Sequence, residues 1–240
     1  MKYELVKDQV MVVNGVTLYR IRALREIPHC AVEAGDFGGW VEGEHNLSQD
    51  DDDAWIFDDA VVYDYAHVSS RAAVYGNARV YGNAVISSNA AVYGKARVYG
   101  KARVYGHAHV SGNAIVSDHA HVYGYAHIYD WATVFGDAQV FGHAQVFGNA
   151  RVFGDARVYA AITGKTHVYG RVEVFGNMEV SDTWQIMRDD EMSFPDWLAV
   201  LDNAAQCADV PVDVGDAALF DLYELGYAPV PSLIAAQFNP

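Results

Sequence analysis

The chain has 240 residues, of which 52% are hydrophobic, and a formal net charge of −15. This apolar content is enough for one or two folded domains and excludes a largely disordered chain. No apolar run approaches the roughly 18–20 residues of a membrane span, and the charged start of the chain lacks the apolar segment of a secretory signal. Cys30 and Cys207 lie far apart without a CxxC spacing, so we expect a reduced, cytoplasmic protein.

The negative charge is concentrated at the two ends of the chain. Residues 1–53 carry 5 Lys/Arg and 11 Asp/Glu, residues 54–181 carry 10 and 9, and residues 182–240 carry 1 and 11. The sequence pattern changes at the same two boundaries. We therefore divide the chain into an N-terminal cap, a repeat region and an acidic C-terminal module.

The N-terminal cap, residues 1–53, is predicted to begin with a β-hairpin. The segment Val10–Tyr19 has two apolar runs separated by Asn-Gly, which favours a two-residue hairpin turn. Farther along, Val41 and Leu47 are six residues apart, and the acidic run Asp50–Asp53 follows them. We expect residues 30–53 to form irregular first turns of the repeat structure, interrupted by an acidic loop.

The middle region, residues 54–181, is an internal repeat of six residues. From Ala54 to Ala156 every sixth residue is alanine, and the second residue after each alanine is Val or Ile. The unit is Ala-x-Val-(Tyr/Phe/Ser)-Gly-x. Ala and Val share one side of an extended segment, and the glycine allows the bend that follows.

Such regular bends predict an all-β solenoid in which short strands stack in parallel on the next turn of a coil. Eighteen units, at three per triangular rung, give six rungs. After Val158 the next aliphatic residue, Ile162, follows at four residues, and the spacing of six then resumes. We therefore expect one shortened corner between Tyr159 and Ile162.

The pattern of an aliphatic residue followed four positions later by a small one, as Val80 is followed by Ala84, resembles the hexapeptide-repeat superfamily. The resemblance implies a triangular parallel β-helix that is left-handed. It also implies that trimers are common and that acyl transfer is the commonest activity. The aromatic residue that often follows valine here departs from the family pattern, in which this residue is usually small or acidic.

The N-terminal part of the chain, up to about Trp55, resembles the start of uncharacterised hexapeptide-repeat proteins encoded by phages and prophages. The segments that carry this resemblance are Leu18–Leu24, Gly35–Glu42 and Asn46–Ser48. If a phage encodes the chain, the expected location is the host cytoplasm.

The C-terminal module, residues 182–240, is predicted to be helical and acidic. Ser193–Asp196 is typical of a helix start, and apolar residues follow at helical spacing. Asp216 and Gly226 can begin and end a second helix. The apolar side chains Trp197, Phe220 and Leu222 need burial, so we expect them to contact a second subunit or a partner.

A basic segment is the first candidate binding site. Six basic residues and no acidic ones occur between Tyr65 and Ser117. One is Arg71, and the other five, which we call the basic belt, are Arg79, Lys95, Arg97, Lys101 and Arg103. Strand positions three repeat units apart lie above one another, so Arg79 and Arg97 repel each other, and an anionic ligand or partner would relieve that repulsion. The alternatives are that the acidic module covers the belt or that its side chains spread into solvent.

Outward aromatic residues are predicted to form stacked ladders along the coil. One is Tyr63, Tyr81 and Tyr99, and the other is Tyr105, Tyr123, Phe141 and Tyr159. Stacking stabilises parallel coils, and it is the favoured role. The alternatives are flat surfaces for a base or sugar, with Tyr81, Tyr99, Tyr105 and Tyr123 as the candidate residues, or a subunit interface.

Ten histidines raise the question of a metal site. His109 lies directly beneath His127, and two His-x-His pairs occur, at His107 and at His119. Because most of these positions are variable in the repeat, we expect no metal and no cofactor.

Acyl transfer would need a loop closing over the substrate, and no residue is inserted between Ala54 and Val158.

The sequence therefore favours a non-enzymatic binding protein of phage or prophage type. Its expected role is to counter host defence by binding a host protein or a phosphate-bearing nucleotide. The alternatives are a hexapeptide-repeat acyltransferase or a purely structural oligomer. We expect a homo-oligomer, either a dimer or a trimer, and expect neither membrane nor nucleic acid as a partner.

Overall fold

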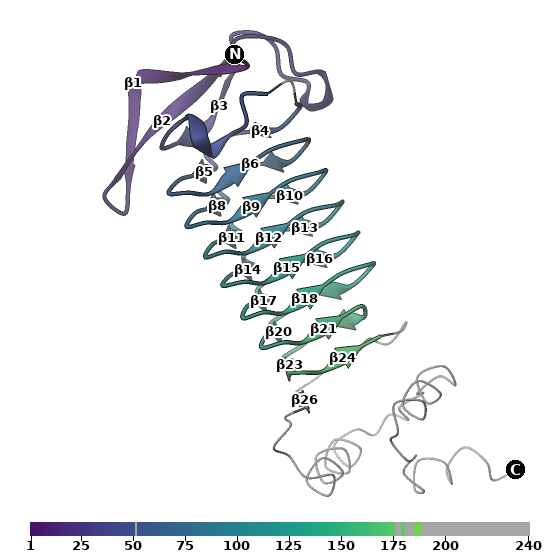
Figure 1. Ribbon diagram of the computed structural model, residues 1–240. Coiled ribbons are helices and arrows are strands. Elements are labelled where there is room, and N and C mark those ends of the chain that lie inside the picture. The colour runs from purple at the N-terminus through teal and green to yellow at the C-terminus, as the bar shows by residue number, and fades with distance from the viewer. Residues whose placement is uncertain (51, 176–178, 181–184, 189–240) are drawn as a thin grey trace, which may run out of the picture.

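The computed structural model describes residues 1–50, 52–175, 179–180 and 185–188 and shows a coil of short parallel strands (Figure 1). The strands belong to three sheets that form the three faces of the coil. The eleven-stranded sheet contains β1 (Tyr3–Val13), β2 (Val16–Ala23), β3 (Phe37–Val41), β5 (Val61–Val62), β8 (Arg79–Val80), β11 (Arg97–Val98), β14 (Ile115–Val116), β17 (Thr133–Val134), β20 (Arg151–Val152), β23 (His167–Gly170) and β26 (Gln185–Arg188).

The other two faces are built only from strands of the coil. The eight-stranded sheet contains β4 (Trp55–Ile56), β7 (Ala73–Val74), β10 (Ala91–Val92), β13 (His109–Val110), β16 (His127–Ile128), β19 (Gln145–Val146), β22 (Ala161–Ile162) and β25 (Glu179–Val180). The seven-stranded sheet contains β6 (His67–Val68), β9 (Val85–Ile86), β12 (Arg103–Val104), β15 (His121–Val122), β18 (Gln139–Val140), β21 (Arg157–Val158) and β24 (Glu173–Val174). The predicted parallel solenoid is confirmed.

The repeated alanine and valine fill the interior of the coil. The repeat alanines from Ala54 to Ala156 and the aliphatic residues from Ile56 to Val158 are at most 1% exposed. Residues three repeat units apart pair in register, as Val98 pairs with Val80 and with Val116. From His67 to Glu173 the x residue before each aliphatic residue is partly or fully exposed, so the two residues of a strand face the surface and the core. In the first two units this position is covered, because Trp55 and Val61 are at most 4% exposed.

The corners depend on residues with positive φ. Glycine fills most of them, as Gly82 does with a φ of 71°. Four corners instead carry aspartate with a φ between 52° and 58°, and each carboxylate accepts a hydrogen bond at 2.9–3.2 Å from the glycine amide of the next rung. These residues are Asp58, Asp64, Asp118 and Asp130. Each aspartate thus joins two rungs and offsets the cost of its left-handed backbone.

The shortened corner near Tyr159 is confirmed. Only two residues separate β21 from β22, where the regular corners have four. The shortened corner changes the register of the strand pairing. Gln145 pairs with Ala161, 16 residues later, whereas the regular register would pair it with Thr163. The change brings the Tyr159 ring over Gly142, where a Cβ would collide with it.

The N-terminal hairpin is confirmed and is longer than predicted. β1 and β2 pair antiparallel from Tyr3 to Ala23, and β3 joins β2 to the coil by pairing antiparallel with β2 and parallel with β5. The irregular first rung is confirmed as well. Val41 pairs with Val62 on the first face and Leu47 with Val68 on the second. Two short 3₁₀ helices, Pro28–Cys30 and Glu44–Asn46, lie in the same region.

An ion pair between the buried Lys2, just before β1, and Asp52 of the acidic loop connects the cap to the start of the coil. Lys2 is 0% exposed, and its Nζ donates a hydrogen bond at 2.6 Å to Oδ1 of Asp52. The other carboxylate oxygen of Asp52 accepts a hydrogen bond from the Ser70 amide at 2.7 Å. Burial lowers the pKa of Lys2. Burial would raise the pKa of Asp52, but the Lys2 hydrogen bond and charge outweigh it and hold this pKa below 3.8.

The predicted helical module, with Trp197, Phe220 and Leu222, lies outside the described residues. Across the part of the chain that the structure describes, no helix has the length and apolar character needed to cross a membrane.

The space available to the inward alanines at the corners can be tested by substitution. Replacing Ala102, which is 0% exposed, with leucine should lower the free energy of unfolding by about 1–3 kcal/mol or more, because the corner has no space for a larger side chain. The matched control is Ala91→Leu, at an outward strand position that is partly exposed. Thermal melting should separate the two variants. Equal melting shifts would contradict the assignment of inward and outward positions.

The Lys2–Asp52 pair gives a second test. Because the pKa of Asp52 is lowered in the folded state, its stabilising effect is present above pH 3.8 and is lost as the pH falls through the folded pKa. Asp52→Asn should destabilise the protein by roughly 3 kcal/mol at pH 7, since it leaves Lys2 buried without its partner. It should also flatten the pH dependence of melting below about pH 5. Asp50→Asn, at an exposed position of the same loop, is the control. If both variants melt like the parent protein, the pair does not hold the cap.

Candidate functional site

The basic belt wraps around one edge of the coil on two neighbouring rungs. Arg97 pairs in register with Arg79 on the eleven-stranded sheet, and Arg103 lies on the seven-stranded sheet between Val85 and His121. Lys95 and Lys101 occupy the corners before and after Arg97. All five side chains are exposed.

Arg71 has a carboxylate within ion-pair distance, whereas the residues of the basic belt have none in the described part of the chain. Arg71 Nε lies 3.5 Å from Oδ2 of Asp53 in the acidic loop. Within the described ranges, none of the five belt residues forms an ion pair. Like charges one rung apart, ~5 Å, repel by about 0.8 kcal/mol in water, so the belt retains an unfavourable local charge that an anion would relieve.

The predicted ladder of Tyr63, Tyr81 and Tyr99 is confirmed. Its rings stack at 5.2 and 4.9 Å with interplanar angles of 8° and 9°. Burial and the neighbouring tyrosines raise the pKa of Tyr81, and the charges of Arg97 and Arg79 oppose that rise. The Tyr81 hydroxyl therefore lies within electrostatic range of two guanidinium groups.

The hairpin covers Tyr63, the first ring of this ladder, a contact that the sequence did not indicate. Tyr63 is 3% exposed and packs with Leu18 and Val61, while the side-chain amide of Asn14 donates to its hydroxyl at 3.2 Å. Tyr63 is therefore structural, and the accessible part of the ladder begins at Tyr81.

The second predicted ladder runs along the next edge. Tyr105, Tyr123 and Phe141 stack at 5.0 and 5.3 Å, whereas Tyr159, which lies in the shortened corner, is tilted by 57° from Phe141. Burial raises the pKa of Tyr105, and the nearby Arg103 opposes that rise. Aromatic stacking and belt charge thus meet on this edge too.

Further ladders were not identified from the sequence. Their members follow the same spacing of one rung and stack at 4.7–5.0 Å: Tyr75 on Tyr93, Tyr129 on Phe147, Phe135 on Phe153 and Tyr169, and His107 on Tyr125 and His143. Aligning the outward residues at intervals of three repeat units would have revealed all of them except Tyr169, which follows Phe153 at 16 residues because of the shortened corner.

The histidines are arranged for stacking. The rings of His109 and His127 lie 4.8 Å apart at an interplanar angle of 19°, and burial together with the His127 charge lowers the pKa of His109. Among the described residues no group of three or more His, Cys, Asp or Glu side chains could hold a metal ion.

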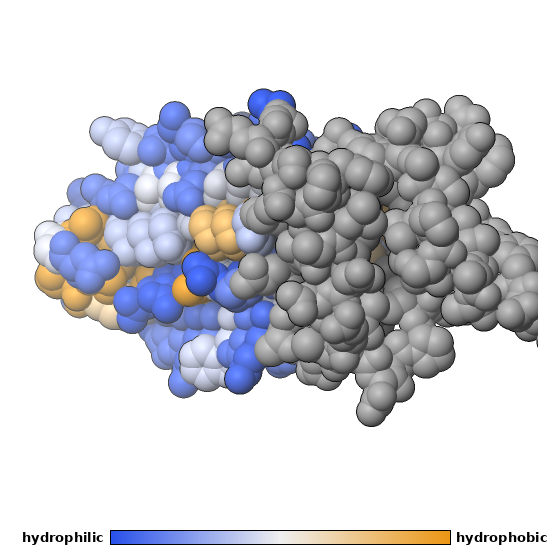
Figure 2. Space-filling view, turned by 90° about the horizontal axis from the view of Figure 1, so that it is seen from below, coloured by the Kyte–Doolittle hydropathy of each residue, from blue (hydrophilic) through white to orange (hydrophobic). Residues whose placement is uncertain are grey.

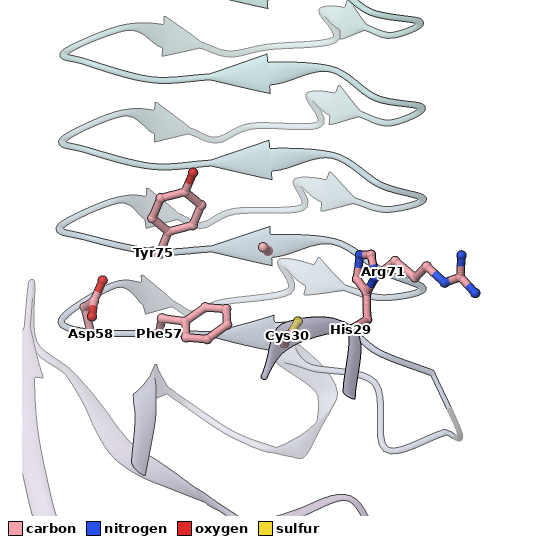
Figure 3. A pocket seen from close by; sticks show the side chains of 7 residues that line it. His29, Cys30, Phe57, Asp58, Arg71 and Tyr75 are labelled. Atoms are coloured by element: carbon pink, nitrogen blue, oxygen red, sulfur yellow. The ribbon is translucent and has the colours of Figure 1, made fainter. Parts of the chain in front are cut away.

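A hollow of about 360 Å³ lies where the cap meets the coil, beside Cys30, Phe57 and Tyr75 (Figure 3). The Cys30 thiol donates to the carbonyl oxygen of Asp53 at 3.1 Å, and burial raises its pKa to about 11, so it is neither a thiolate nor a nucleophile at neutral pH. Figure 3 shows the Arg71 side chain extending away from the two rings. The hollow is therefore a gap in the contact between the cap and the coil.

Seen along the coil from below, most of the coloured surface is hydrophilic, and an apolar patch lies on the side where the hairpin projects (Figure 2). Two valines on the outer face of the hairpin, Val10 and Val12, are 48% and 66% exposed.

No loop projects from the coil between Trp55 and Val158, because strands of two residues follow one another at a constant spacing of six. The loop that would close over an acyl donor is therefore absent from this part of the described chain.

Three segments of the coil match a family model described as YdcK Beta solenoid repeat: residues 72–88, 102–118 and 144–160. No curated protein is similar enough to the chain to match it. Each matching segment begins at a corner alanine and spans most of one rung. The repeat pattern and the three parallel sheets together show that the chain is a β-solenoid repeat protein.

Proposed function

We propose that this protein is a non-enzymatic binding protein whose coil presents the basic belt to a phosphate-bearing ligand. The observation that carries the proposal is the arrangement of the belt. Five exposed basic side chains lie on two neighbouring rungs without an ion-pair partner in the described structure, and Arg79 and Arg97 are held in register.

The chemistry of the belt suits phosphate. Guanidinium groups bind phosphate oxygens through paired, charge-assisted hydrogen bonds, and the lysines at the corners add mobile positive charge. Tyrosine hydroxyls at Tyr81 and Tyr105 lie near these arginines and can donate further hydrogen bonds. The backbone under the belt is fixed by hydrogen bonds to the rungs on both sides, so little order has to be gained on binding.

The biological role we propose is interference with a host system by a phage or prophage. The resemblance of the N-terminal cap to proteins of phages and prophages supports this origin. Sequestering a phosphate-bearing nucleotide, or covering an acidic surface of a host defence protein, would use the same belt. The charge of the belt favours the nucleotide as the first ligand to test.

Charge reversal tests the proposed function. Inorganic tripolyphosphate should bind the full chain, with an affinity that falls as salt rises from about 0.05 to 0.3 M. Arg97→Glu combined with Arg103→Glu should weaken this binding roughly 100-fold or more, because each charged hydrogen bond contributes about 1.5–3 kcal/mol. Titration calorimetry measures the affinity, and circular dichroism should show an unchanged fold.

Lys165→Glu is the matched control, because Lys165 is exposed at a corner away from the belt. If this control weakens binding as much as the double reversal does, only net charge matters. If the double reversal instead changes the molecular mass or the melting temperature, the acidic module or a second subunit covers the belt.

Self-association is a separate part of the proposal. The exposed aromatic side chains Tyr65, Trp131 and Tyr125 and the valines of the hairpin offer rigid contact surfaces. Light scattering at micromolar concentration should therefore give a multiple of the chain mass of 26.4 kDa. A monomer mass throughout the micromolar range would be incompatible with this.

A further inference from the structure

One aromatic ladder is interrupted by a single serine. On the edge that follows the eight-stranded sheet, Tyr75 stacks on Tyr93 at 4.7 Å, and Tyr129 stacks on Phe147 at 4.8 Å. Ser111 occupies the equivalent position on the rung between Tyr93 and Tyr129. The ladder therefore has one gap, with an aromatic ring below it and another above it.

The gap is an open hollow. Its volume is about 430 Å³, which falls within the range of small-molecule sites. The lining residues come from four successive rungs: Tyr93, Ser111, Gly112, His127, Tyr129, Asp130 and Gln145.

The spacing of the rungs fits one planar ring. Rungs are ~4.8 Å apart, so a ring placed beside Ser111 would lie at the ordinary ladder distance from both tyrosines. Ladder tyrosines also approach the outward strand residue of the next rung. The rings of Tyr93 and His109 are T-shaped at 6.1 Å and 86°, and those of Tyr105 and His121 at 6.2 Å and 81°. A ring in the gap would meet His127 in the same way.

The other serine with a ring on both sides does not create such a site. Ser117 lies between Tyr99 and Phe135 on the next edge, but it is 4% exposed, so its gap is closed. Ser111 is partly exposed, and among the described residues its hydroxyl has no hydrogen bond within the protein. Ser111 therefore combines three features: an accessible gap, an aromatic ring on the rung to either side, and a hydroxyl without a hydrogen bond in the described part of the protein.

Polar groups around the hollow indicate the kind of ring. Asp130 accepts a hydrogen bond from the Gly148 amide through Oδ2, and no bond to its Oδ1 is found in the described part of the protein. Ser111 and His127 add donors and acceptors, and Gln145, whose Oε1 accepts a hydrogen bond from the Tyr129 hydroxyl at 3.3 Å, keeps its amide nitrogen as a donor. A hydrocarbon ring would leave the Ser111 hydroxyl and Oδ1 of Asp130 without a partner, whereas a nucleobase presents both donors and acceptors at its edge.

The lower rim of the hollow connects it to the basic belt. The Lys95 backbone amide donates at 2.7 Å to the carbonyl oxygen of Gly112, which lines the hollow, and the Lys95 side chain is exposed. Arg97 follows two residues later. A phosphate attached to a ring in the hollow would therefore meet positive charge at this corner.

We propose that the hollow at Ser111 binds the base of a free purine nucleotide between Tyr93 and Tyr129, with its phosphate directed toward Lys95. This inference rests on the proposed function for the phosphate, but the base site stands on its own geometry. Stacking is not specific for one base, and a purine offers the larger stacking surface.

Filling the gap tests the proposal. Ser111→Tyr completes the ladder with the residue that the repeat favours, and it should weaken binding of adenosine 5′-monophosphate and of adenosine at least tenfold. Ser87→Tyr is the matched control, because it makes the same change at an equivalent position away from the hollow. Tyr129→Leu removes one wall without filling the gap and should weaken both ligands as well. Calorimetry with the full chain measures affinity, and melting curves confirm folding.

Two probes separate the base site from the phosphate site. Adenosine should bind the parent chain with little salt dependence, and the advantage of the monophosphate over adenosine should disappear in Lys95→Gln. Equal affinity of Ser111→Tyr and the parent chain for the monophosphate would overturn the proposal. So would the absence of binding of both ligands at millimolar concentration, while binding of tripolyphosphate would still support the proposed function. Adenosine binding without tripolyphosphate binding would support the hollow and overturn the proposed function.

Discussion

The close stacking of rungs is the constraint on which the rest of the structure depends. Each strand contributes one aliphatic side chain to the interior, and the corner that follows takes a small, fully buried residue, as Ala102 and its equivalents show in the regular coil and Thr166 shows after the shortened corner. Parallel hydrogen bonding then places every residue beneath its equivalent one rung later. Outward residues of the same kind therefore form columns along an edge, and a residue of another kind interrupts its column.

This regularity divides the surface into columns with separate uses. Aromatic columns stack and stiffen the edges, aspartates at corners join neighbouring rungs, and charged residues occupy strand positions that the core does not constrain. The candidate sites arise where a column changes composition. The basic belt begins where acidic residues stop, and the hollow at Ser111 exists because one aromatic ring is missing from its column. A binding surface can thus be formed by substitution of single outward residues, without any change of backbone.

The regular part of the fold could be predicted from the sequence because its period is short and every unit repeats the same local signals. The hairpin turn, the first rung through Val41 and Leu47, the ladders of Tyr81 and Tyr105 and the shortened corner all followed from spacing. Contacts between remote segments could not be predicted in this way. The pairing of Lys2 with Asp52, the covering of Tyr63 by the hairpin and the ion pair of Arg71 with Asp53 depend on how the cap packs against the coil. The hollow could not be predicted from the repeat unit alone, because serine is one of the ordinary residues after valine, and Ser111 differs in having the rings of Tyr93 and Tyr129 on the rungs next to it.

The shortened corner at Tyr159 has a consequence for how the chain finds its fold. A coil of nearly identical units can pair each strand with the wrong equivalent, one rung too early or too late, and lose little energy by doing so. The offset of three full repeat units that holds through most of the coil becomes shorter after β21, and the acidic loop lengthens the first rung at the other end. A chain misaligned by one rung would bring a long corner against a short one at both places. These two irregularities act as alignment marks, and they leave an otherwise degenerate repeat with a single register.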